Sequence, residues 1–463
     1  MDQQKLMNRR ILMIAAAFPP TGGSGVQRSA KFAKYLPRFG WRPIVWSIKE
    51  LEGMPRDATL LHDLPSAVSI HARSWSRPLY RVRRAIEHLS DSVGLIAPLG
   101  RAARWRLDAR VTATEDRMDP DHYITWARES VEPLLRLIEQ ERVDIIYSTF
   151  SPASNHWLGL KLKRRTGLPW VADFRDLWTE DYRYTEASAS RRAAHRKLEQ
   201  EILERADAVV GVSEPQTRLL ADRAGGWRRK FHTITNGYDP DDFRCGVASA
   251  PKIGSDRPLR LAHVGRFDHW RTPDEWFAGL EQFALRLGAE RDRFELRIIG
   301  HADQNTLHRT EASGVRCTFS GHMAHADAIR EMCQADALLL NVPGGTNAES
   351  VIPAKMFEYL AAQRPILVVG PSDGEAARLV RLCHAGWTTG FDEHAIAGAL
   401  CELFDAWRAG QSMPSCSSDG LEPYSRVKLA YQLAEVLDDL VSDTNDQYYV
   451  ETGSRVGVGM VTG

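Results

Sequence analysis

A short run of small residues, placed between an apolar segment and a helical pattern, is the first feature of this sequence that suggests chemistry. The run Gly22-Gly-Ser-Gly25 follows the apolar segment Ile11–Phe18. Glycines let the backbone approach a bound group closely, and the N–H groups at a helix start favour an anion, so the loop suits a phosphate or a sugar. We predict ligand contacts from Gly23, Ser24 and Gly25; a tight turn is the alternative explanation.

Other kinds of chemistry find less support. The glycine loop lacks the G-x-G-x-x-G pattern, and no acidic residue ends the next strand at Trp46, which disfavours a nicotinamide enzyme. Asp119-Pro-Asp121 and Asp239-Pro-Asp241 match a metal-binding D-x-D pattern, but neither follows a buried strand and proline suits a turn. The six cysteines form no zinc-type spacing and fit a reduced compartment. We therefore predict no metal and no cofactor.

Two series of apolar strands alternating with helical patterns position the candidate loop. The first predicts strands at Ile11–Phe18, Pro43–Trp46, Asp144–Ser148, Pro169–Asp173 and Ala208–Val212, with a long charged helix over Ser188–Arg205. The second predicts a helix over Pro273–Leu287 and strands at Leu259–Val264, Phe294–Ile299, Cys317–Phe319, Ala337–Leu340 and Pro365–Val369. The stretch Gly246–Pro258 between the two series has the composition of a linker.

This organisation predicts an α/β protein with two Rossmann-like, doubly wound domains that face each other across a cleft. We place the N-terminal domain at residues 1–245 and the C-terminal domain at 258–441. A basic helical excursion interrupts the first domain at about 51–143, and residues 442–463 are predicted to be a disordered tail.

The overall charge is neutral, with 60 Lys and Arg against 60 Asp and Glu, which argues against a protein that binds nucleic acid through bulk positive potential. Local charge is less even. From Arg73 to Arg110, nine arginines stand against three acidic residues, with aromatic and aliphatic residues between them. Such a segment suits the surface of an anionic membrane; a solvated helical excursion packed on the first domain is the alternative. The run Ile11–Phe18 is too short to span a bilayer, and no small-residue cleavage pattern of a signal peptide follows it. The sequence therefore predicts a cytoplasmic protein, with any membrane contact peripheral and at the inner membrane face.

Several segments in a fixed order resemble the bacterial family-4 glycosyltransferases of the GT-B fold. In the first half they are Phe18-Pro-Pro-Thr-Gly-Gly-Ser-Gly-Val-Gln-Arg28, Trp170-Val-Ala-Asp-Phe-Arg-Asp-Leu-Trp178 and Thr235-Asn-Gly-Tyr-Asp239. In the second half they are His263-Val-Gly-Arg266, Arg271-Thr-Pro273 and Ile352-Pro-Ala-Lys-Met-Phe-Glu-Tyr-Leu-Ala-Ala362. The resemblance covers most of the chain, apart from the basic excursion and the C-terminal tail.

The resemblance implies transfer of a sugar from a nucleotide diphosphate donor, during which negative charge develops on the leaving diphosphate. Cations can meet that charge without a metal. The resemblance assigns this role to Arg266, Arg271 and Lys355. The family usually has lysine at the position of Arg271, and arginine keeps the charge and adds a fork suited to phosphate oxygens. Surface ion pairs are the alternative roles for the two arginines.

The resemblance also implies the remaining donor contacts. Pro353 would begin a helix whose N–H groups receive the diphosphate, and Glu358 would accept hydrogen bonds from the ribose; a salt bridge between Lys355 and Glu358 is the alternative. The family commonly has a second glutamate where this chain has Ser350, and the adjacent Glu349 is the candidate replacement. The backbone around Gly321 is expected to lie near the nucleobase.

The remaining candidates belong to the first half. By resemblance His156, at the start of a helix, would face the cleft near the donor sugar as a neutral imidazole. Asp173, Arg175 and Asp176 follow a predicted strand and are expected to line the acceptor side or brace the cleft.

The sequence therefore predicts a retaining glycosyltransferase that acts on a saccharide or lipid-linked acceptor in bacterial surface polysaccharide synthesis. Two other classes stay open. A sugar-nucleotide epimerase has a related architecture but usually needs acidic groups that we do not locate here. A non-catalytic nucleotide-sugar-binding subunit is favoured by Ser350 in place of the family's glutamate.

Overall fold

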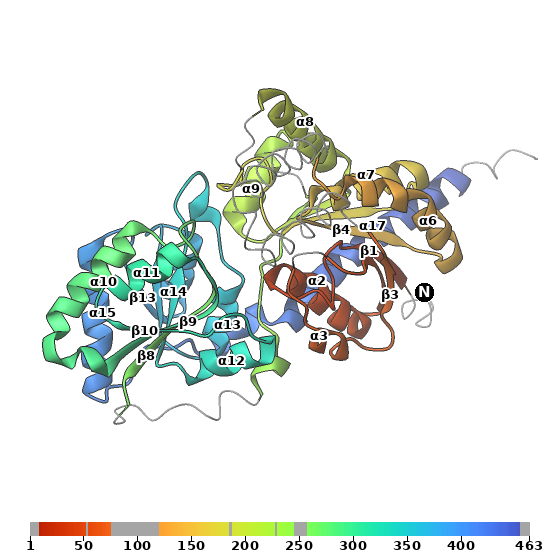
Figure 1. The fold of residues 1–463 in the computed structure, drawn as a ribbon. Coiled ribbons are helices and arrows are strands. Elements are labelled where there is room, and N and C mark those ends of the chain that lie inside the picture. The colour runs from red at the N-terminus through yellow and green to blue at the C-terminus, as the bar shows by residue number, and fades with distance from the viewer. Residues whose placement is uncertain are drawn as a thin grey trace, which may run out of the picture.

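Two parallel β-sheets, each covered by helices on both faces, make up the protein (Figure 1). The structure is a computed structural model that describes residues 9–51, 54–75, 120–184, 188–226, 229–244 and 257–453. The predicted α/β architecture with two Rossmann-like domains is confirmed. Most of the basic excursion lies outside the described residues, so its proposed membrane contact stays a prediction.

The first sheet has seven strands in the order β3-β2-β1-β4-β5-β6-β7. Its strands are β1 (Arg9–Ile14), β2 (Trp41–Ile48), β3 (Ser69–Arg73), β4 (Ile145–Phe150), β5 (Trp170–Phe174), β6 (Ala208–Gly211) and β7 (Phe231–Thr233). The helices between them are α2 (Ser24–Tyr35), α3 (Thr59–His62), α6 (Ile124–Glu141), α7 (Ala153–Thr166), α8 (Ala189–Arg205) and α9 (Glu214–Arg223).

The second sheet has six strands in the order β10-β9-β8-β11-β12-β13. Its strands are β8 (Leu259–Phe267), β9 (Phe294–Ala302), β10 (Arg316–Phe319), β11 (Ala337–Asn341), β12 (Ile366–Val369) and β13 (Gly386–Thr388). The accompanying helices are α10 (Asp274–Leu287), α11 (Gln304–Ala312), α12 (His325–Gln334), α13 (Lys355–Ala361), α14 (Glu375–Leu382), α15 (Glu393–Arg408) and α16 (Ser418–Leu421).

Each sheet is apolar on both faces because parallel strands are covered on both sides. In β1, Leu12 and Ile14 pack into the core that contains α6 and α7, whereas Ile11 and Met13 pack into the core that contains α2. The second sheet divides its core in the same way, with α12, α13 and α14 on one face and α10 and α15 on the other. The near-continuous apolar runs of the sequence are explained by this two-sided burial.

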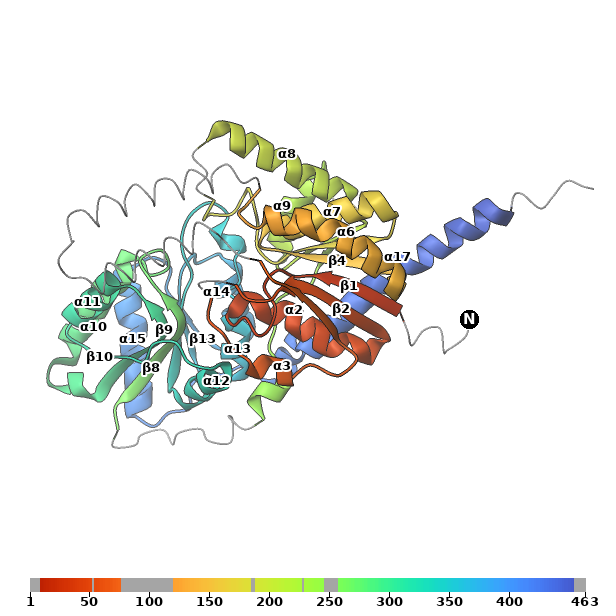
Figure 2. The same cartoon turned by 45° about the vertical axis from the view of Figure 1, so that its right-hand side comes forward.

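The last helix, α17 (Arg426–Gly453), returns from the second domain to the first (Figures 1 and 2). Its buried residues Leu429, Leu433 and Leu437 join the core on the α2 face of the first sheet. We predicted that the C-terminal domain ends at residue 441 and that a disordered tail follows. In the structure α17 packs on the first domain and continues to Gly453. Leucines at four-residue spacing bury one side of the helix, and the polar composition after residue 442 concealed its continuation.

The two segments that cross between the domains lie beside each other. The Tyr238 N–H donates to the Tyr424 carbonyl at 3.1 Å, and the Arg426 N–H donates to the Tyr238 carbonyl at 2.8 Å. These bonds form a short parallel bridge at the junction of the domains. The crossings are therefore held together where the chain leaves the first domain and where it comes back.

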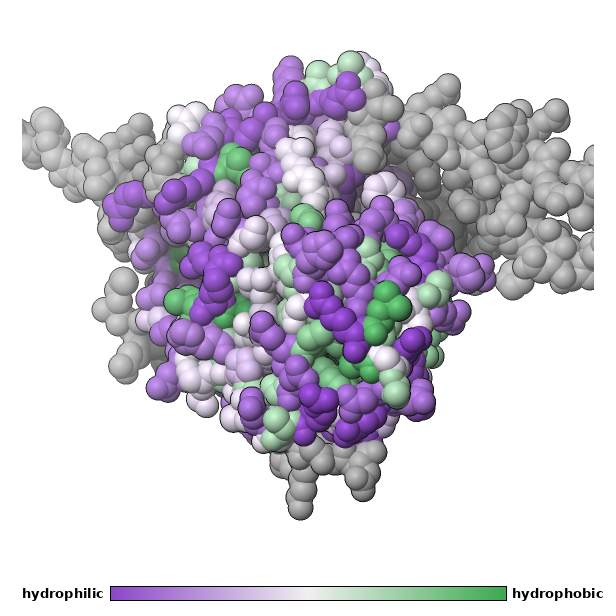
Figure 3. Space-filling model, turned by 90° about the vertical axis from the view of Figure 1, so that its left-hand side faces the viewer, coloured by the Kyte–Doolittle hydropathy of each residue, from purple (hydrophilic) through white to green (hydrophobic). Residues whose placement is uncertain are grey.

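Three short edge strands, β3, β7 and β13, are additional to those predicted. They contain three to five residues, and β3 alternates between intermediate and exposed side chains, so it has no buried run to detect. Within the described residues, no helix is both long enough and apolar enough to cross a membrane. The outer face of the second domain is largely hydrophilic, with small separate apolar areas (Figure 3).

Replacing Leu433 with alanine tests the position of α17. We expect Leu433→Ala to lower the free energy of unfolding by about 2–5 kcal/mol, because a fully buried leucine leaves a cavity. Denaturant unfolding followed by tryptophan fluorescence measures the change. Glu435→Ala, at an exposed position of the same helix, is the control and should shift stability by less than about 0.5 kcal/mol. Equal effects of the two substitutions would place α17 outside the core.

Candidate functional site

The neighbouring strands β8 and β11 separate at their carboxyl ends and open a crevice in the second sheet. Strand β8 stays paired with β9 as far as Phe267 and Ala302, but its pairing with β11 ends at Ala262 and Leu338. The strand order reverses between β8 and β11. Ligands of open α/β sheets bind at such switch points, so this crevice is a candidate ligand site.

Lys355 places its ammonium over the crevice. A Cβ atom on Gly265 would lie 2.5 Å from the Lys355 Nζ and would displace the ammonium, and the φ of 127° at Gly265 favours glycine there. Burial, followed by the charge of Arg271, lowers the pKa of Lys355 to about 7. A lysine with a depressed pKa beside another cation is typical of a site that receives an anion.

The two predicted arginines extend from the loop after β8. The Arg266 side chain is 63% exposed and its Nη1 lies 3.8 Å from an Asp268 oxygen. The Arg271 side chain is 27% exposed and pairs with Asp268 at 3.0 Å. The predicted surface ion pairs therefore exist, but they share one carboxylate. Two guanidinium groups and Lys355 against Asp268 leave net positive charge at the crevice.

Helix α13 carries Lys355 and Glu358 but differs from the predicted diphosphate-binding helix. It begins at Lys355 rather than at Pro353. The Met356 and Phe357 N–H groups donate to the Pro353 and Ala354 carbonyls, so these two N–H groups already have partners within the chain.

Glu358 faces a histidine rather than Lys355. Its Oε1 lies 3.9 Å from His325 Nε2, and the two described side chains Lys355 and Glu358 form no ion pair within 4.0 Å. The alternative of a structural salt bridge between them is therefore wrong. The Glu358 side chain is 21% exposed, so its carboxylate is accessible to a ligand.

The adjacent residues Glu349 and Ser350 differ in burial: Glu349 is exposed and Ser350 is buried. Ser350 is 2% exposed, and its hydroxyl donates to the Asn347 carbonyl at 2.7 Å. Its own carbonyl accepts from the Ser213 hydroxyl of the first domain at 2.7 Å. Glu349 is exposed, so Ser350 is committed to packing and Glu349 is the side chain left for a ligand.

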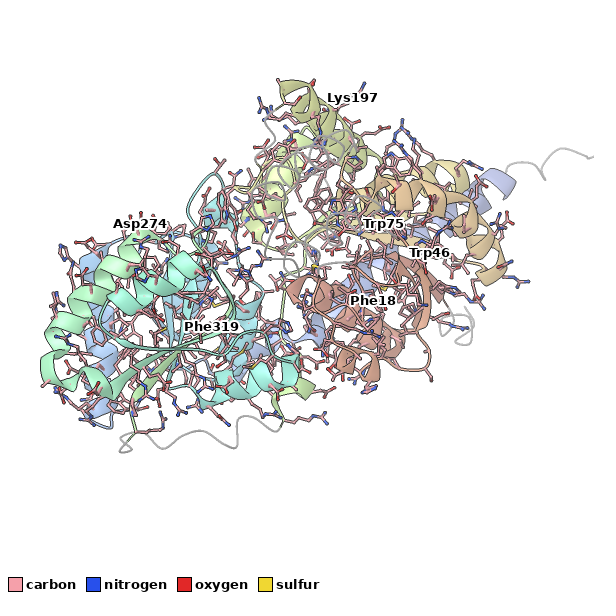
Figure 4. The ribbon with its side chains drawn as sticks, viewed as in Figure 1. Phe18, Trp46, Trp75, Lys197, Asp274 and Phe319 are labelled. Carbon is pink, nitrogen blue, oxygen red and sulfur yellow. The ribbon has the colours of Figure 1, made fainter. Side chains whose placement is uncertain are left out.

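Gly321 lies in the loop after β10. Its carbonyl accepts from the Gly300 N–H at 2.7 Å, and a Cβ placed on it would meet nothing within 4 Å. Phe319, labelled at the end of β10 in Figure 4, is 47% exposed. An open backbone beside an exposed ring fits the predicted surroundings of a nucleobase.

The glycine loop of the first domain lies against Arg175. A Cβ on Gly25 would be 2.7 Å from the Arg175 Nη1, and Arg175 donates from Nη2 to the Ser151 carbonyl at 3.1 Å. Gly23 precedes α2 with a φ of 100°, and Ser24 is the first residue of the helix. Arg175 thus joins the glycine loop to the loop that follows β4.

His156 is buried, which differs from the predicted position facing the cleft. Its ring lies among Phe150, Phe174 and Trp170 and is 0% exposed. Burial, opposed by the charge of Asp173, lowers the pKa of His156 to about 3. The ring is neutral, as predicted, but burial rather than a helix terminus is the main cause.

The tautomer of His156 follows from its neighbours. The Trp170 indole N–H donates to the Ser148 hydroxyl at 2.8 Å, and that hydroxyl lies 2.7 Å from His156 Nδ1. Ser148 has no other acceptor among the described residues, so its proton goes to Nδ1 and the ring proton lies on Nε2. Within the same residues Nε2 has no partner, which leaves one buried donor unused.

Asp173 is the centre of a buried network rather than an open contact on the acceptor side. It is 0% exposed and accepts from Arg28 at 2.7 Å, from the Tyr147 hydroxyl at 2.6 Å and from Thr149 at 3.0 Å. Burial opposes its ionisation, but the charge and hydrogen bonds of Arg28 keep the pKa of Asp173 below its usual value. Asp173 thus braces the cleft, whereas Asp176 is 38% exposed and pairs with Arg183 at 3.0 Å.

Those D-x-D aspartates that the structure describes have protein partners. Asp121 accepts from the Ser154 N–H at the start of α7, and Asp119 lies outside the described residues. Asp239 belongs to an acidic group with Asp63 and Asp242, whose ligand atoms approach within 4.8 Å of one another. The Lys31 ammonium bonds to all three, at 2.8, 2.6 and 3.1 Å. Lys34 also contacts Asp63 at 3.9 Å and Asp239 at 2.8 Å, so two lysines offset the charge of the acidic group.

The model of glycosyltransferase family 4 matches residues 116–242, within the first domain. Solved structures extend the likeness to the whole chain: sucrose-phosphate synthase from Thermosynechococcus elongatus is 17% identical, with a TM-score of 0.60 over 94% of this chain and 100% of that one. The fold is GT-B, and the family-4 resemblance is confirmed. No curated protein sequence matches this chain.

Two further GT-B structures are similar to the chain. WaaG, a glycosyltransferase involved in lipopolysaccharide biosynthesis, is 14% identical, with a TM-score of 0.56 over 92% of this chain and 99% of that one. An Anabaena protein in complex with UDP-glucose is 15% identical, with a TM-score of 0.56 over 93% and 99%. These structures share the GT-B fold with this chain, and the family match supports glycosyl transfer.

Contacts between the domains of this GT-B protein bring the crevice close to the first domain. Asn347 donates to the Glu180 carbonyl at 2.9 Å, beside the Ser213 contact to Ser350. His325, at the start of α12, pairs with Asp242 at 3.2 Å, and its N–H lies 3.4 Å from an Asp57 oxygen. The loops of both domains therefore meet around the candidate donor site.

Four residues that contact the candidate site residues were not predicted as site residues from the sequence. Arg28 and His263 stand inside the quoted motifs, but nothing in their spacing revealed a buried ion pair or a contact with Lys355. Tyr147 and Tyr359 are buried tyrosines whose hydroxyls bond to Asp173 and to the backbone of β8. Their burial inside apolar runs was the available signal, because a buried tyrosine hydroxyl needs a partner.

Removing the charge of Asp173 tests the buried network. We expect Asp173→Asn to lower the free energy of unfolding by about 3–5 kcal/mol, because Arg28 would keep a buried charge without its partner. Chemical denaturation measures this loss. Asp176→Asn, three residues along the chain and partly exposed, is the matched control and should cost less than about 1 kcal/mol. A loss for Asp173→Asn no larger than that of the control would contradict the network's structural role.

The depressed pKa of Lys355 predicts proton uptake when an anion binds. The free lysine is largely neutral above pH 7, and a bound diphosphate favours the charged form, so binding at pH 8.5 should take up a proton that binding at pH 6 does not. Affinity should fall by up to about tenfold per pH unit above 7. Calorimetry with UDP, or with GDP if UDP does not bind, in buffers of different ionisation enthalpy measures the uptake.

Lys355→Arg is the control for this measurement because arginine stays charged over the whole range. The difference in uptake between wild type and this variant isolates Lys355 from the titration of the nucleotide itself. If both proteins take up the same number of protons at pH 8.5, the assignment of the titrating group to Lys355 is wrong.

Proposed function

We propose that this protein is a retaining glycosyltransferase that moves a sugar from a nucleotide diphosphate donor to a saccharide or lipid-linked acceptor. The observation that carries the proposal is the cationic crevice of the second domain, where Lys355, Arg266 and Arg271 gather at the switch point of the sheet. Cations held there stabilise the charge that develops on a departing diphosphate. The Anabaena structure, solved with UDP-glucose, supports a nucleotide-sugar donor.

In the proposed reaction the bond between the anomeric carbon and the diphosphate oxygen breaks. The acceptor hydroxyl oxygen forms a new bond to the same carbon and on the same face, and its proton passes to the leaving phosphate oxygen. Lys355, Arg266 and Arg271 stabilise the diphosphate, and no separate metal is required for that charge. We assign Glu358 to the ribose, the Gly321 loop to the base and Glu349 to the donor sugar.

The first domain supplies the acceptor side in this proposal. Gly23, Ser24 and Gly25 lie at the start of α2, and Arg175 crosses that loop. The unused Nε2 proton of His156 is available to a sugar hydroxyl if the aromatic side chains around it shift on binding. A lipid-linked acceptor at an inner membrane face, in surface polysaccharide synthesis, is consistent with the biosynthetic role of WaaG and with the basic excursion.

The experiment is a panel of UDP-, GDP- and other nucleotide sugars, with nucleotide release measured with and without membrane lipid extract. A transferase releases nucleotide at its full rate only when acceptor is present. An epimerase converts the nucleotide sugar without acceptor, and a binding subunit retains it unchanged. The last alternative rests on Ser350, which the structure uses for contact with Ser213.

Arg266→Ala is the decisive variant for the proposed transferase. We expect turnover to fall by about 100-fold or more, because a cation that meets developing charge contributes roughly 3–4 kcal/mol to the barrier. The fold should be unchanged, since the side chain is 63% exposed. Arg330→Ala, an exposed arginine of α12, serves as the control and should keep wild-type turnover. Turnover near the wild-type rate in Arg266→Ala would sink the assignment.

A further inference from the structure

The crevice between β8 and β11 is held open by two side chains that replace the missing strand pairing. Beyond Ala262 the Val264 N–H donates to the Tyr359 hydroxyl at 2.8 Å, and that hydroxyl lies 3.3 Å from the Leu339 carbonyl. His263 Nδ1 lies 3.1 Å from the same carbonyl. The backbone groups left by the separating strands are thus satisfied, and the His263 ring is fixed at one end.

The other end of the His263 ring meets Lys355. Nε2 lies 3.3 Å from the Lys355 Nζ and 3.1 Å from the Arg266 carbonyl. Burial, and then the charge of Lys355, hold the pKa of His263 well below its usual value, so the ring is neutral and carries one proton. A carbonyl faces each ring nitrogen, and a neutral ring donates to only one of them. We infer that the proton lies on Nδ1, directed at Leu339, because only this tautomer lets Nε2 accept from the ammonium; the other would donate from Nε2 to the Arg266 carbonyl.

The carboxylates near Lys355 are engaged elsewhere. Asp268 pairs with Arg271 at 3.0 Å, and Glu358 is turned toward His325. Among the residues that the structure describes, no carboxylate lies within 4.0 Å of the Lys355 Nζ. The neutral His263 nitrogen is therefore its hydrogen-bond acceptor.

Lys31 shows what an acidic partner does to a lysine in the same chain. It is buried at a 2.6 Å contact with Asp239, and its pKa is raised by Asp242 and Asp239 in spite of burial. An ammonium held in this way has no net charge left for a ligand. When Lys355 is protonated, a neutral acceptor orients its ammonium without cancelling the charge.

We propose that His263 is a positioning residue whose Nε2 holds the Lys355 ammonium over Gly265, ready for the diphosphate of a nucleotide sugar. The proposal rests on the proposed function, since it assumes that Lys355 meets the donor. When the diphosphate arrives, Lys355 exchanges one neutral acceptor for phosphate oxygens. No carboxylate has to be displaced in this exchange.

Two amide substitutions at His263 distinguish the contribution of Nδ1 from that of Nε2. His263→Asn keeps a donor near Nδ1 for Leu339 but has no atom at the position of Nε2. His263→Gln places an amide oxygen near Nε2 but loses the bond to Leu339, whose carbonyl keeps its Tyr359 contact. We expect UDP binding, or GDP binding if UDP does not bind, to weaken about tenfold in His263→Asn and less than about threefold in His263→Gln. Titration calorimetry measures both.

The same substitutions in a Lys355→Met background complete the test. If His263 acts through Lys355, His263→Asn should have no further effect on nucleotide binding once the ammonium is gone. A purely structural role predicts the opposite: His263→Gln would be the more damaging change, and the His263→Asn effect would persist without Lys355. Either result overturns the proposal. Unchanged nucleotide binding in Lys355→Met alone would instead overturn the diphosphate role of Lys355, and the positioning role of His263 with it.

Discussion

The buried ion pair between Arg28 and Asp173 is the interaction on which the first domain and its side of the cleft depend. The guanidinium reaches from α2 to the end of β5, and it also donates to the carbonyls of Ile234 and Thr235, just before the chain leaves the domain. Tyr147 and Thr149 extend the network to β4. One charged pair therefore fixes the glycine loop, two central strands and the exit toward the second domain. Because both groups are excluded from water, the arrangement is stable only while every member is present.

In the second domain, neutral side chains rather than a buried ion pair connect the elements around the crevice. Where β8 and β11 separate, a histidine and a tyrosine take over the hydrogen bonds of the sheet, and the space above them is left to cations. The first sheet has a comparable device at its own switch point, where Asn155 accepts from the Ala16 N–H and donates to the Thr149 carbonyl. Polar side chains inserted between diverging strands keep both crevices open without leaving backbone groups unsatisfied. In the second domain the inserted His263 also contacts Lys355.

Much of the fold could be predicted because parallel strands buried on both faces form continuous apolar runs. The runs around Ile11, Ile145 and Leu338 all proved to be central strands, whereas the edge strand β3 has no such run. The cationic candidates Arg266, Arg271 and Lys355 were also within reach, since they lie in motifs that resemble those of family 4. Buried members were harder to predict. Nothing in the sequence distinguishes the acid of a sealed network, Asp173, from the partly exposed Asp176 three residues later, because burial depends on partners as distant as Arg28. For the same reason His156 was placed at an open cleft when aromatic rings enclose it.

The return of α17 to the first domain has a consequence for the order in which the protein folds during synthesis. The last strand of the first sheet ends at Thr233, and the helix that completes its α2-side core begins at Arg426, roughly 190 residues later. A ribosome must therefore produce the entire second domain before the first can bury the surface reserved for Leu429, Leu433 and Leu437. In the interval this apolar face is exposed to the cell, and the second domain has time to fold as a unit of its own. The first domain is therefore completed only after the second, when α17 packs onto its core. The two segments that cross between the domains then lie together at the bridge between Tyr238 and Ser425.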